Sequence, residues 1–257
     1  MFYWRSTVAP TVAGAPVVEL AFTRRAGLEP PGASHGAASR FGGFNLGGHV
    51  GDDPRVVERN RVALARAVGV ARERLVFMRQ VHGTTVADVS GPWKAAPPEC
   101  DGIVTATGNL ALAVLVADCV PVLLHDSTAG VVGAVHAGRP GMTDRIVAAA
   151  VARMRELGAV DVAAVVGPSV CGRCYELPEE LVAAAGRTSP VSVTRSWSGT
   201  PAVDVAAGVV DQLMTEGVAV QWVPGCTRED EDLYSYRRVR KTGRFAGVVV
   251  LRTGGES

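Results

Sequence analysis

The chain has 257 residues, of which 47% are hydrophobic, and its 26 basic and 25 acidic side chains give a net charge of +1. This composition supports a sizeable buried core and excludes an intrinsically disordered chain. The balanced charge gives no overall field that would attract nucleic acid or an anionic membrane, and no run of 18 uninterrupted apolar residues predicts a membrane span.

The first half of the chain predicts short valine-rich strands and one well-delimited helix. The helix is expected over 52–69, with Asp52 or Asp53 as the N-cap, Pro54 at the first helical position and Gly69 at the end. The strands are expected over 17–23, 74–82, 84–90, 110–116 and 120–126. Gly83 is typical of a tight turn or bulge between two of them.

The second half predicts two more helices, over 141–157 and from Asp204 to Gly217, and a hairpin turn at 126–130. Strand pairs joined by short turns, with helices inserted between groups, favour an α+β fold over a regular parallel wind. We expect a single domain over 1–257, with residues 1–15 poorly ordered. The remaining strands are expected over 130–137, 162–167, 218–223 and 245–252.

The five cysteines are scattered and odd in number, unlike the dense, even set of a small secreted disulfide scaffold. The first 20 residues lack the basic region and sustained apolar run of a signal peptide. We therefore expect a cytoplasmic protein with reduced thiols.

Three potential metal ligands lie at the ends of predicted strands: His82, Cys119 and His136. Two imidazoles and a thiolate suit Zn²⁺, and three protein ligands leave a fourth coordination position open. Asp118 is then a candidate for holding a ligand imidazole or the metal-bound water, or for proton transfer. Because separations of 37 and 17 residues form no local ligand motif, the pattern alone leaves open ordinary core or surface histidines.

A series of motifs in a fixed order covers the chain from about residue 20 to about residue 250. In this order the sequence resembles the laccase-domain family, also called YfiH-like or multicopper polyphenol oxidase-like, whose members act as purine nucleoside phosphorylases. The motifs include "FNLGGHVGDDPRVVERNR" (44–61), "RQVHGTTV" (79–86), "CDGIVT" (100–105), "ADCVPVLL" (117–124), "AVHAGRPG" (134–141), "GPSVCGRCYEL" (167–177) and "CTREDEDLYSYRR" (226–238).

The resemblance implies a zinc site from His82, Cys119 and His136 in one α+β domain, a sandwich of mixed β-sheets flanked by helices. It also implies phosphorolysis of adenosine, inosine, guanosine and methylthioadenosine, and deamination of adenosine. The expected partners are a purine nucleoside and phosphate, without nucleic acid or membrane, and the expected state is a monomer or small homo-oligomer. Arg40 is the first candidate for binding phosphate, because arginine binds oxyanions bidentately.

One motif departs from the family pattern. The family has His-Ala-Gly-Trp-Arg-Gly where this chain has residues 136–141, "HAGRPG", so Arg139 replaces a tryptophan and Pro140 an arginine. Arg139 is therefore a candidate substrate-binding residue, since its planar guanidinium partly replaces a stacking ring. The same departure leaves open a degenerate, non-catalytic pocket.

Other interpretations remain. A His₂Cys site also binds Cu²⁺, as an adventitious or alternative metal, which leaves open a polyphenol oxidase-like enzyme. Cys119 and His136 would alternatively form the nucleophile and base of a cysteine hydrolase. "CGRC" (171–174) suggests a redox pair or second metal site, but a structural loop is the favoured interpretation. The segment 234–244, which contains the basic run 236–244, is interpreted as a structural loop or a loop at the edge of a pocket, and not as a nucleic-acid patch.

Overall fold

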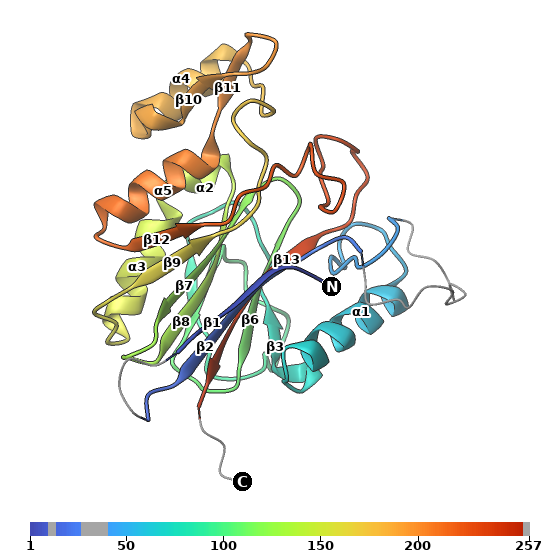
Figure 1. The fold of residues 1–257 in the computed structure, drawn as a ribbon, viewed down its shortest axis with the longest axis vertical. Coiled ribbons are helices and arrows are strands. Elements are labelled where there is room, and N and C mark those ends of the chain that lie inside the picture. The colour runs from blue at the N-terminus through green and yellow to red at the C-terminus, as the bar shows by residue number, and fades with distance from the viewer. Residues whose placement is uncertain (10–13, 27–40, 254–257) are drawn as a thin grey trace.

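Two β-sheets face each other and carry helices on their outer sides (Figure 1). The structure is a computed structural model that describes residues 1–9, 14–26 and 41–253. The segments 10–13, 27–40 and 254–257 lie outside the described residues. Among the described residues, no helix has the length and apolar character needed to cross a membrane.

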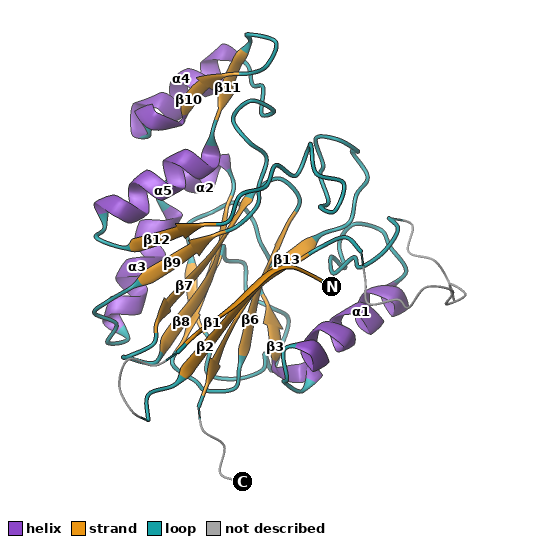
Figure 2. Cartoon of the chain, viewed as in Figure 1, coloured by secondary structure: helices purple, strands orange, loops and turns teal. Residues whose placement is uncertain are grey.

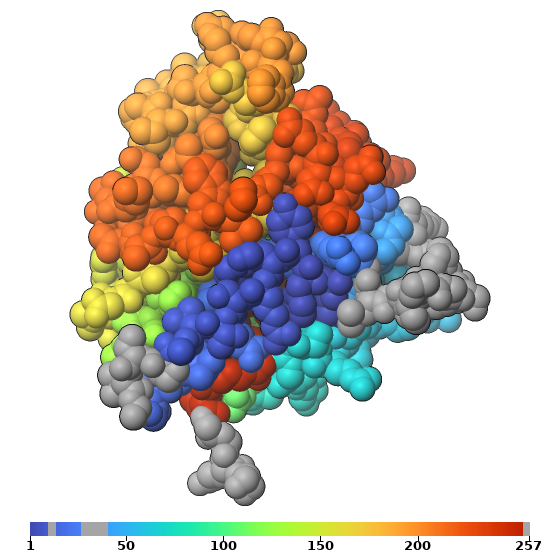
Figure 3. Space-filling view, viewed as in Figure 1, coloured from blue at the N-terminus to red at the C-terminus, as the bar shows by residue number. Residues whose placement is uncertain are grey.

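The first sheet has five strands, antiparallel except for one parallel pair at its edge. In spatial order they are β1 (Phe2–Val8), β2 (Val17–Thr23), β13 (Phe245–Arg252), β6 (Ala111–Val116) and β3 (Leu75–Phe77), and β3 runs parallel to β6. The N-terminal segment Phe2–Val8 therefore forms an edge strand, within the range 1–15 for which poor order was expected. It pairs with β2, and the Tyr3 hydroxyl donates to a carboxylate oxygen of Asp230 at 3.0 Å. Figure 3 shows the dark blue N-terminal segment against the orange-red segment.

The second sheet has six strands, in the spatial order β12 (Ala219–Trp222), β9 (Ala163–Val166), β7 (Val120–Asp126), β8 (Val131–Ala137), β5 (Gly102–Thr105) and β4 (Val86–Asp88). Its outermost pairs, β12 with β9 and β4 with β5, are parallel and the others antiparallel. The predicted hairpin turn at 126–130 joins β7 to β8. A carboxylate oxygen of Asp126 accepts the backbone N–H of Thr128 and Ala129 there, and Gly130 has φ 67°.

The helices cover the outer faces of the two sheets (Figure 2). Helix α1 (Pro54–Ala67) packs Leu64 and Ala65 on the five-stranded sheet, and Asp53 caps it by accepting the backbone N–H of Arg55. Helices α3 (Ile146–Glu156) and α5 (Val205–Thr215) lie on the six-stranded sheet. Side chains of β2, β13 and β6 meet those of β7, β8 and β9 between the sheets, so the layers run helix, sheet, sheet, helix. This confirms the expected α+β sandwich.

Several details differ from the sequence expectations. The helix expected over 141–157 is split into α2 (Arg139–Thr143) and α3, because Arg145 between them takes a left-handed conformation with φ 65°. The strands around Gly83 shrink to β3 and β4 and join different sheets, so Gly83 closes no hairpin. Further elements not expected are β5, α4 (Glu179–Thr188), the pair β10 (Val193–Arg195) and β11 (Pro201–Val203), and 3₁₀ turns at Arg72–Arg74 and Pro190–Ser192.

Candidate metal centre and cavity

The candidate ligands lie where the chain passes from one sheet to the other. His82 lies in the connection from β3 of the five-stranded sheet to β4 of the six-stranded sheet. Cys119 lies in the connection from β6 to β7, which makes the same crossing, and His136 is on β8. The two crossings meet beside β8, so side chains distant in sequence come together.

The ligand atoms of His82, Cys119 and His136 all lie within 4.8 Å of one another. The Sγ of Cys119 is 3.6 Å from Nε2 of His82, and the two imidazoles meet edge to face with ring centroids 4.7 Å apart. His136 is buried, Cys119 half-buried and His82 exposed, so the cluster is open on one side. This nitrogen and sulfur donor set fits a zinc ion with one open coordination position.

A buried carboxylate that sequence reasoning missed organises two of these ligands. Asp101 accepts Nδ1–H of His136 at 2.8 Å, which leaves the Nε2 of that ring available as a ligand. The same carboxylate accepts the backbone N–H groups of Val81, His82 and Gly83 at 3.2, 3.0 and 2.7 Å. The role expected for Asp118, holding a ligand imidazole, is thus filled by Asp101. Its sequence signals are its place directly before an apolar run and within the motif "CDGIVT" (100–105).

The cluster favours ionisation of the Cys119 thiol. Burial opposes the thiolate, but the imidazoles of His136 and His82 outweigh burial and lower the pKa of Cys119 to about 6. Burial also disfavours a charged His136, yet Cys119 and Asp101 raise the pKa of this imidazole to about 9. A thiolate, the form that binds metal, is therefore already favoured at neutral pH.

The backbone around the cluster adopts uncommon conformations. His82 has φ 63° and Asp118 has φ 105°, and these are two of the four non-glycine residues with positive φ in the described part of the chain. Positive φ in such residues costs free energy and recurs at functional sites. Gly138 approaches closely, because a Cβ there would lie 2.5 Å from Cδ2 of His82 and 3.3 Å from Sγ of Cys119.

Asp118 anchors a distant loop rather than a ligand. One oxygen of its carboxylate accepts the hydroxyls of Thr227 and Ser235 at 2.7 and 2.6 Å, and the other accepts the backbone N–H of Arg237 at 2.7 Å. These bonds fasten the segment 226–238 beside Cys119. The nearby Arg237 guanidinium lies 4.5 Å from the ring centroid of Tyr175.

The cluster opens into a cavity of about 850 Å³, large enough for a nucleoside with a phosphate. Phe77, Met78, Leu115 and Val116 form part of an apolar wall, and Tyr175 and Tyr236 contribute aromatic rings. Among the described lining residues, Asp118 is the single carboxylate. It is outnumbered by the arginines at positions 61, 79, 237, 240 and 244, so the cavity favours anions.

The structure describes only one of the two arginines that were predicted to bind substrate. Arg40 lies outside the described residues. Arg139 is half-buried at the start of α2, next to Gly138, and is not among the residues lining the cavity. It acts on the cavity electrostatically: burial raises the pKa of Tyr175, and the charges of Arg237 and Arg139 oppose that rise. Sequence reasoning did not single out Arg61 or Tyr175. Arg244 belongs to the basic run 236–244, and Tyr236, Arg237 and Arg240 of that run also line the cavity.

Comparisons with known proteins agree with this architecture. A purine nucleoside phosphorylase of Streptomyces coelicolor is 51% identical over 232 residues, covering 86% of this chain and 96% of the relative. One of Corynebacterium glutamicum is 46% identical, covering 91% and 94%. The crystal structure of a Neisseria meningitidis protein matches with a TM-score of 0.78 at 31% identity, covering 96% of this chain and 99% of that one. The model of the family described as multi-copper polyphenol oxidoreductase laccase matches residues 19–252, so the chain belongs to that family.

Proposed function

We propose that this protein cleaves purine nucleosides with phosphate and that His82, Cys119 and His136 hold a Zn²⁺ ion. One observation carries the proposal: the His–Cys–His cluster opens into a cavity that combines arginines with aromatic and apolar walls. The proposed substrate class is supported by relatives at 46–52% identity, which are named purine nucleoside phosphorylases.

The arginines of the cavity suit a phosphate dianion. Arg61 is held by its Nε–H bond to the carbonyl of Leu46 at 3.0 Å and by stacking on Phe77, 4.3 Å from the ring centroid. Arg244 donates to the carbonyls of Thr242 and Gly243 at 3.0 Å. Burial lowers the pKa of both guanidiniums, so a bound anion would stabilise their charged forms. We assign phosphate to this pair, with Arg40 as a further proposed ligand.

The aromatic side of the cavity suits a purine. The ring of Tyr175 is backed by Arg237, and Tyr236 lies 5.2 Å from the guanidinium of Arg240. Stacking a base on an aromatic ring contributes about 1–3 kcal/mol and tolerates different bases. We therefore assign the base to the side of Tyr175 and Tyr236, with Arg139 near its edge.

In phosphorolysis, a phosphate oxygen forms a bond to C1′ of the ribose while the bond from C1′ to the purine nitrogen breaks and the purine takes the electron pair. Zinc, when bound, supplies Lewis acidity beside the reacting groups. Arg61 and Arg244 orient the phosphate for attack. Asp101 keeps the proton on Nδ1 of His136, and Asp118 acts as a positioning residue through Arg237.

Two alternatives belong to the same site. Deamination of adenosine needs a water molecule and proton transfer but no phosphate. The open side of the ligand cluster gives water access to the site, which favours this alternative. Copper chemistry of a multinuclear kind is less favoured, because the cluster brings together two imidazoles and one thiol among the described residues. We place the reaction in the cytoplasm, where reducing conditions keep the Cys119 thiol available.

The test is a panel of adenosine, inosine, guanosine and methylthioadenosine, incubated with zinc-loaded protein with and without phosphate. Release of free base that requires phosphate supports the phosphorylase, and conversion of adenosine to inosine without phosphate supports the deaminase. Arg244→Gln should raise the KM for phosphate more than the KM for the nucleoside. No turnover of any nucleoside would leave the non-catalytic pocket as the better interpretation.

A further inference from the structure

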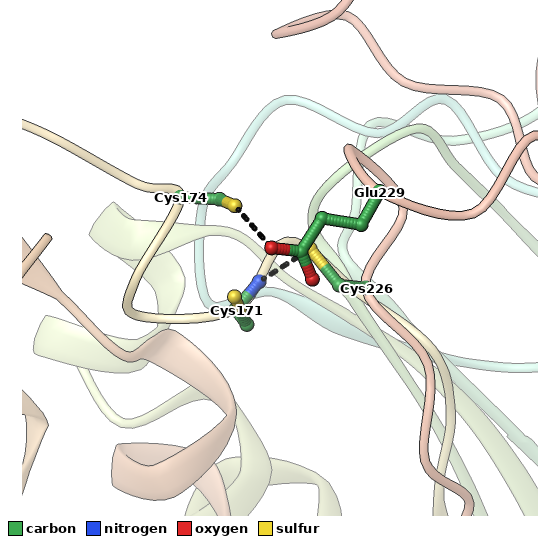
Figure 4. Close-up of side chains that lie close together, drawn as sticks. All are labelled: Cys171, Cys174, Cys226 and Glu229. Atoms are coloured by element: carbon green, nitrogen blue, oxygen red, sulfur yellow. Dashed lines mark hydrogen bonds between the residues drawn. The ribbon is translucent and has the colours of Figure 1, made fainter. Parts of the chain in front are cut away.

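A second group of metal-binding side chains lies away from the proposed active site. Cys171, Cys174, Cys226 and Glu229 point toward a common centre (Figure 4). Their three sulfur atoms and one carboxylate oxygen all lie within 4.8 Å of one another. Neither the fold nor the proposed reaction requires three thiols and a carboxylate to gather at one point.

The group is built from two tight turns that face each other. The backbone N–H of Cys174 donates to the carbonyl of Cys171 at 2.9 Å, and that of Glu229 donates to the carbonyl of Cys226 at 3.1 Å. Each turn therefore presents two donor atoms three residues apart. The backbone around Ser169 bridges to Cys226, which fixes the turns side by side.

The geometry fits a tetrahedral ion. With a Zn–S bond of about 2.3 Å, the ligand atoms of a tetrahedral site are about 3.8 Å apart. The observed limit of 4.8 Å leaves shifts of about an ångström to close the site. Outer contacts already orient the donors: the backbone N–H of Cys171 donates to Sγ of Cys226 at 3.5 Å, and the Trp197 indole donates to Glu229 at 3.1 Å.

We propose that Cys171, Cys174, Cys226 and Glu229 bind a second Zn²⁺ ion with a structural role. Four protein ligands fill the tetrahedral shell and leave no open position, which distinguishes structural from catalytic zinc. A disulfide is the competing outcome. It would join only two of the three thiols and leave the third beside the Glu229 carboxylate.

The proposed ion would tie together two walls of the active-site cavity. Tyr175 directly follows Cys174, while Arg237 lies in the segment that begins at Cys226. Arg237 donates to the carbonyl of Glu176 at 2.9 Å, and Arg228 donates to that of Cys174 at 3.2 Å. The ion would therefore hold the Tyr175–Arg237 pair in place without touching substrate.

The test uses Cys119→Ala as background, so that the remaining metal reports on this site alone. After equilibration with zinc and removal of excess, we expect wild type to hold about two equivalents and Cys119→Ala about one. Adding Cys174→Ser should remove that remaining equivalent. Glu229→Gln should weaken zinc affinity about 10- to 100-fold in the same background, while the matched control Glu231→Gln, at an exposed position of the same loop, should not.

Three results would overturn the proposal: no zinc in Cys119→Ala, zinc that survives Cys174→Ser, or an intact mass two hydrogens short, which would reveal a disulfide. If Cys174→Ser fails to fold, Co²⁺ titration of Cys119→Ala decides whether the second site binds metal. Apart from the cluster, that variant keeps only Cys100. Strong thiolate-to-cobalt absorption supports the site, and its absence contradicts it.

Discussion

Replacing Asp101 by asparagine tests how the candidate metal centre is organised. One carboxylate oxygen accepts the backbone N–H of His82 and the Nδ1–H of His136, and the other accepts the backbone N–H of Val81 and Gly83. The side chain is fully buried. An amide has a single acceptor oxygen, so whichever way it turns, two of these four donors face an NH₂ group.

The magnitude follows from those two donors. A buried donor left unpaired costs about 1–3 kcal/mol, so two cost about 2–6 kcal/mol. The two surviving bonds also weaken, because a neutral acceptor replaces a charged one. We expect Asp101→Asn to lower the free energy of unfolding by about 3–5 kcal/mol. Zinc affinity should fall about 10- to 100-fold, because Asp101 orients two of the ligands.

The assay is urea unfolding of chelator-treated protein, with zinc affinity measured separately by competition against a coloured chelator. Asp161→Asn is the matched control, because Asp161 is exposed and the same substitution there should change stability by less than about 0.5 kcal/mol. A loss below about 1 kcal/mol with unchanged zinc affinity would refute the role assigned to Asp101.

Three further predictions concern positions around the site and the fold. Gly138→Ala should lower zinc affinity at least tenfold, because the added Cβ would meet His82. Gly91→Ala should leave zinc affinity unchanged, because a Cβ there would have no atom within 4 Å. Equal zinc affinities of the two variants would contradict the close approach at Gly138. Arg139→Trp should lower the KM for a purine nucleoside about tenfold without changing zinc content, and a large loss of activity would instead make Arg139 a substrate contact. Burial opposes ionisation of Asp126, but four backbone N–H bonds hold its pKa below the usual range. The ionised Asp126 carboxylate therefore stabilises the folded state above about pH 4, and this contribution is lost as the pH falls through the folded pKa. Asp126→Asn should accordingly lower the melting temperature more at neutral pH than at about pH 3.

The sequence predicts strands better than it predicts their partners. The strands expected over 120–126 and 245–252 match β7 and β13 in their bounds, because apolar runs end at clear turn signals. The strands flanking Gly83, between which a tight turn or bulge was expected, lie in different sheets, since nothing in an apolar run specifies which sheet it joins. The break at Arg145 also escaped prediction, because a left-handed conformation there depends on tertiary packing.

In the candidate site, too, the sequence predicts some residues and misses those whose role depends on tertiary contacts. Metal ligands can be recognised from residue type, so His82, Cys119 and His136 stand out in the sequence. The fold brings their ligand atoms within 4.8 Å of one another. Asp101 does not stand out, because its partners are three backbone N–H groups and an imidazole 35 residues away. Arg61 and Arg79 escape for a related reason: an isolated arginine in sequence is usually a surface charge. Arg237, Arg240 and Arg244 instead belong to the basic run that the sequence placed at the edge of a pocket.

The two crossings that carry His82 and Cys119 have a consequence for folding. Each connects the five-stranded sheet to the six-stranded sheet, so the ligands meet only after the sheets have docked. An ion bound there stabilises the docked state and not the separate sheets, in proportion to the logarithm of its free concentration. Because such long-range pairings form late and slowly, metal would be captured near the end of folding. The supply of that ion during synthesis would then affect the lifetime of the native protein more than the rate of its initial collapse.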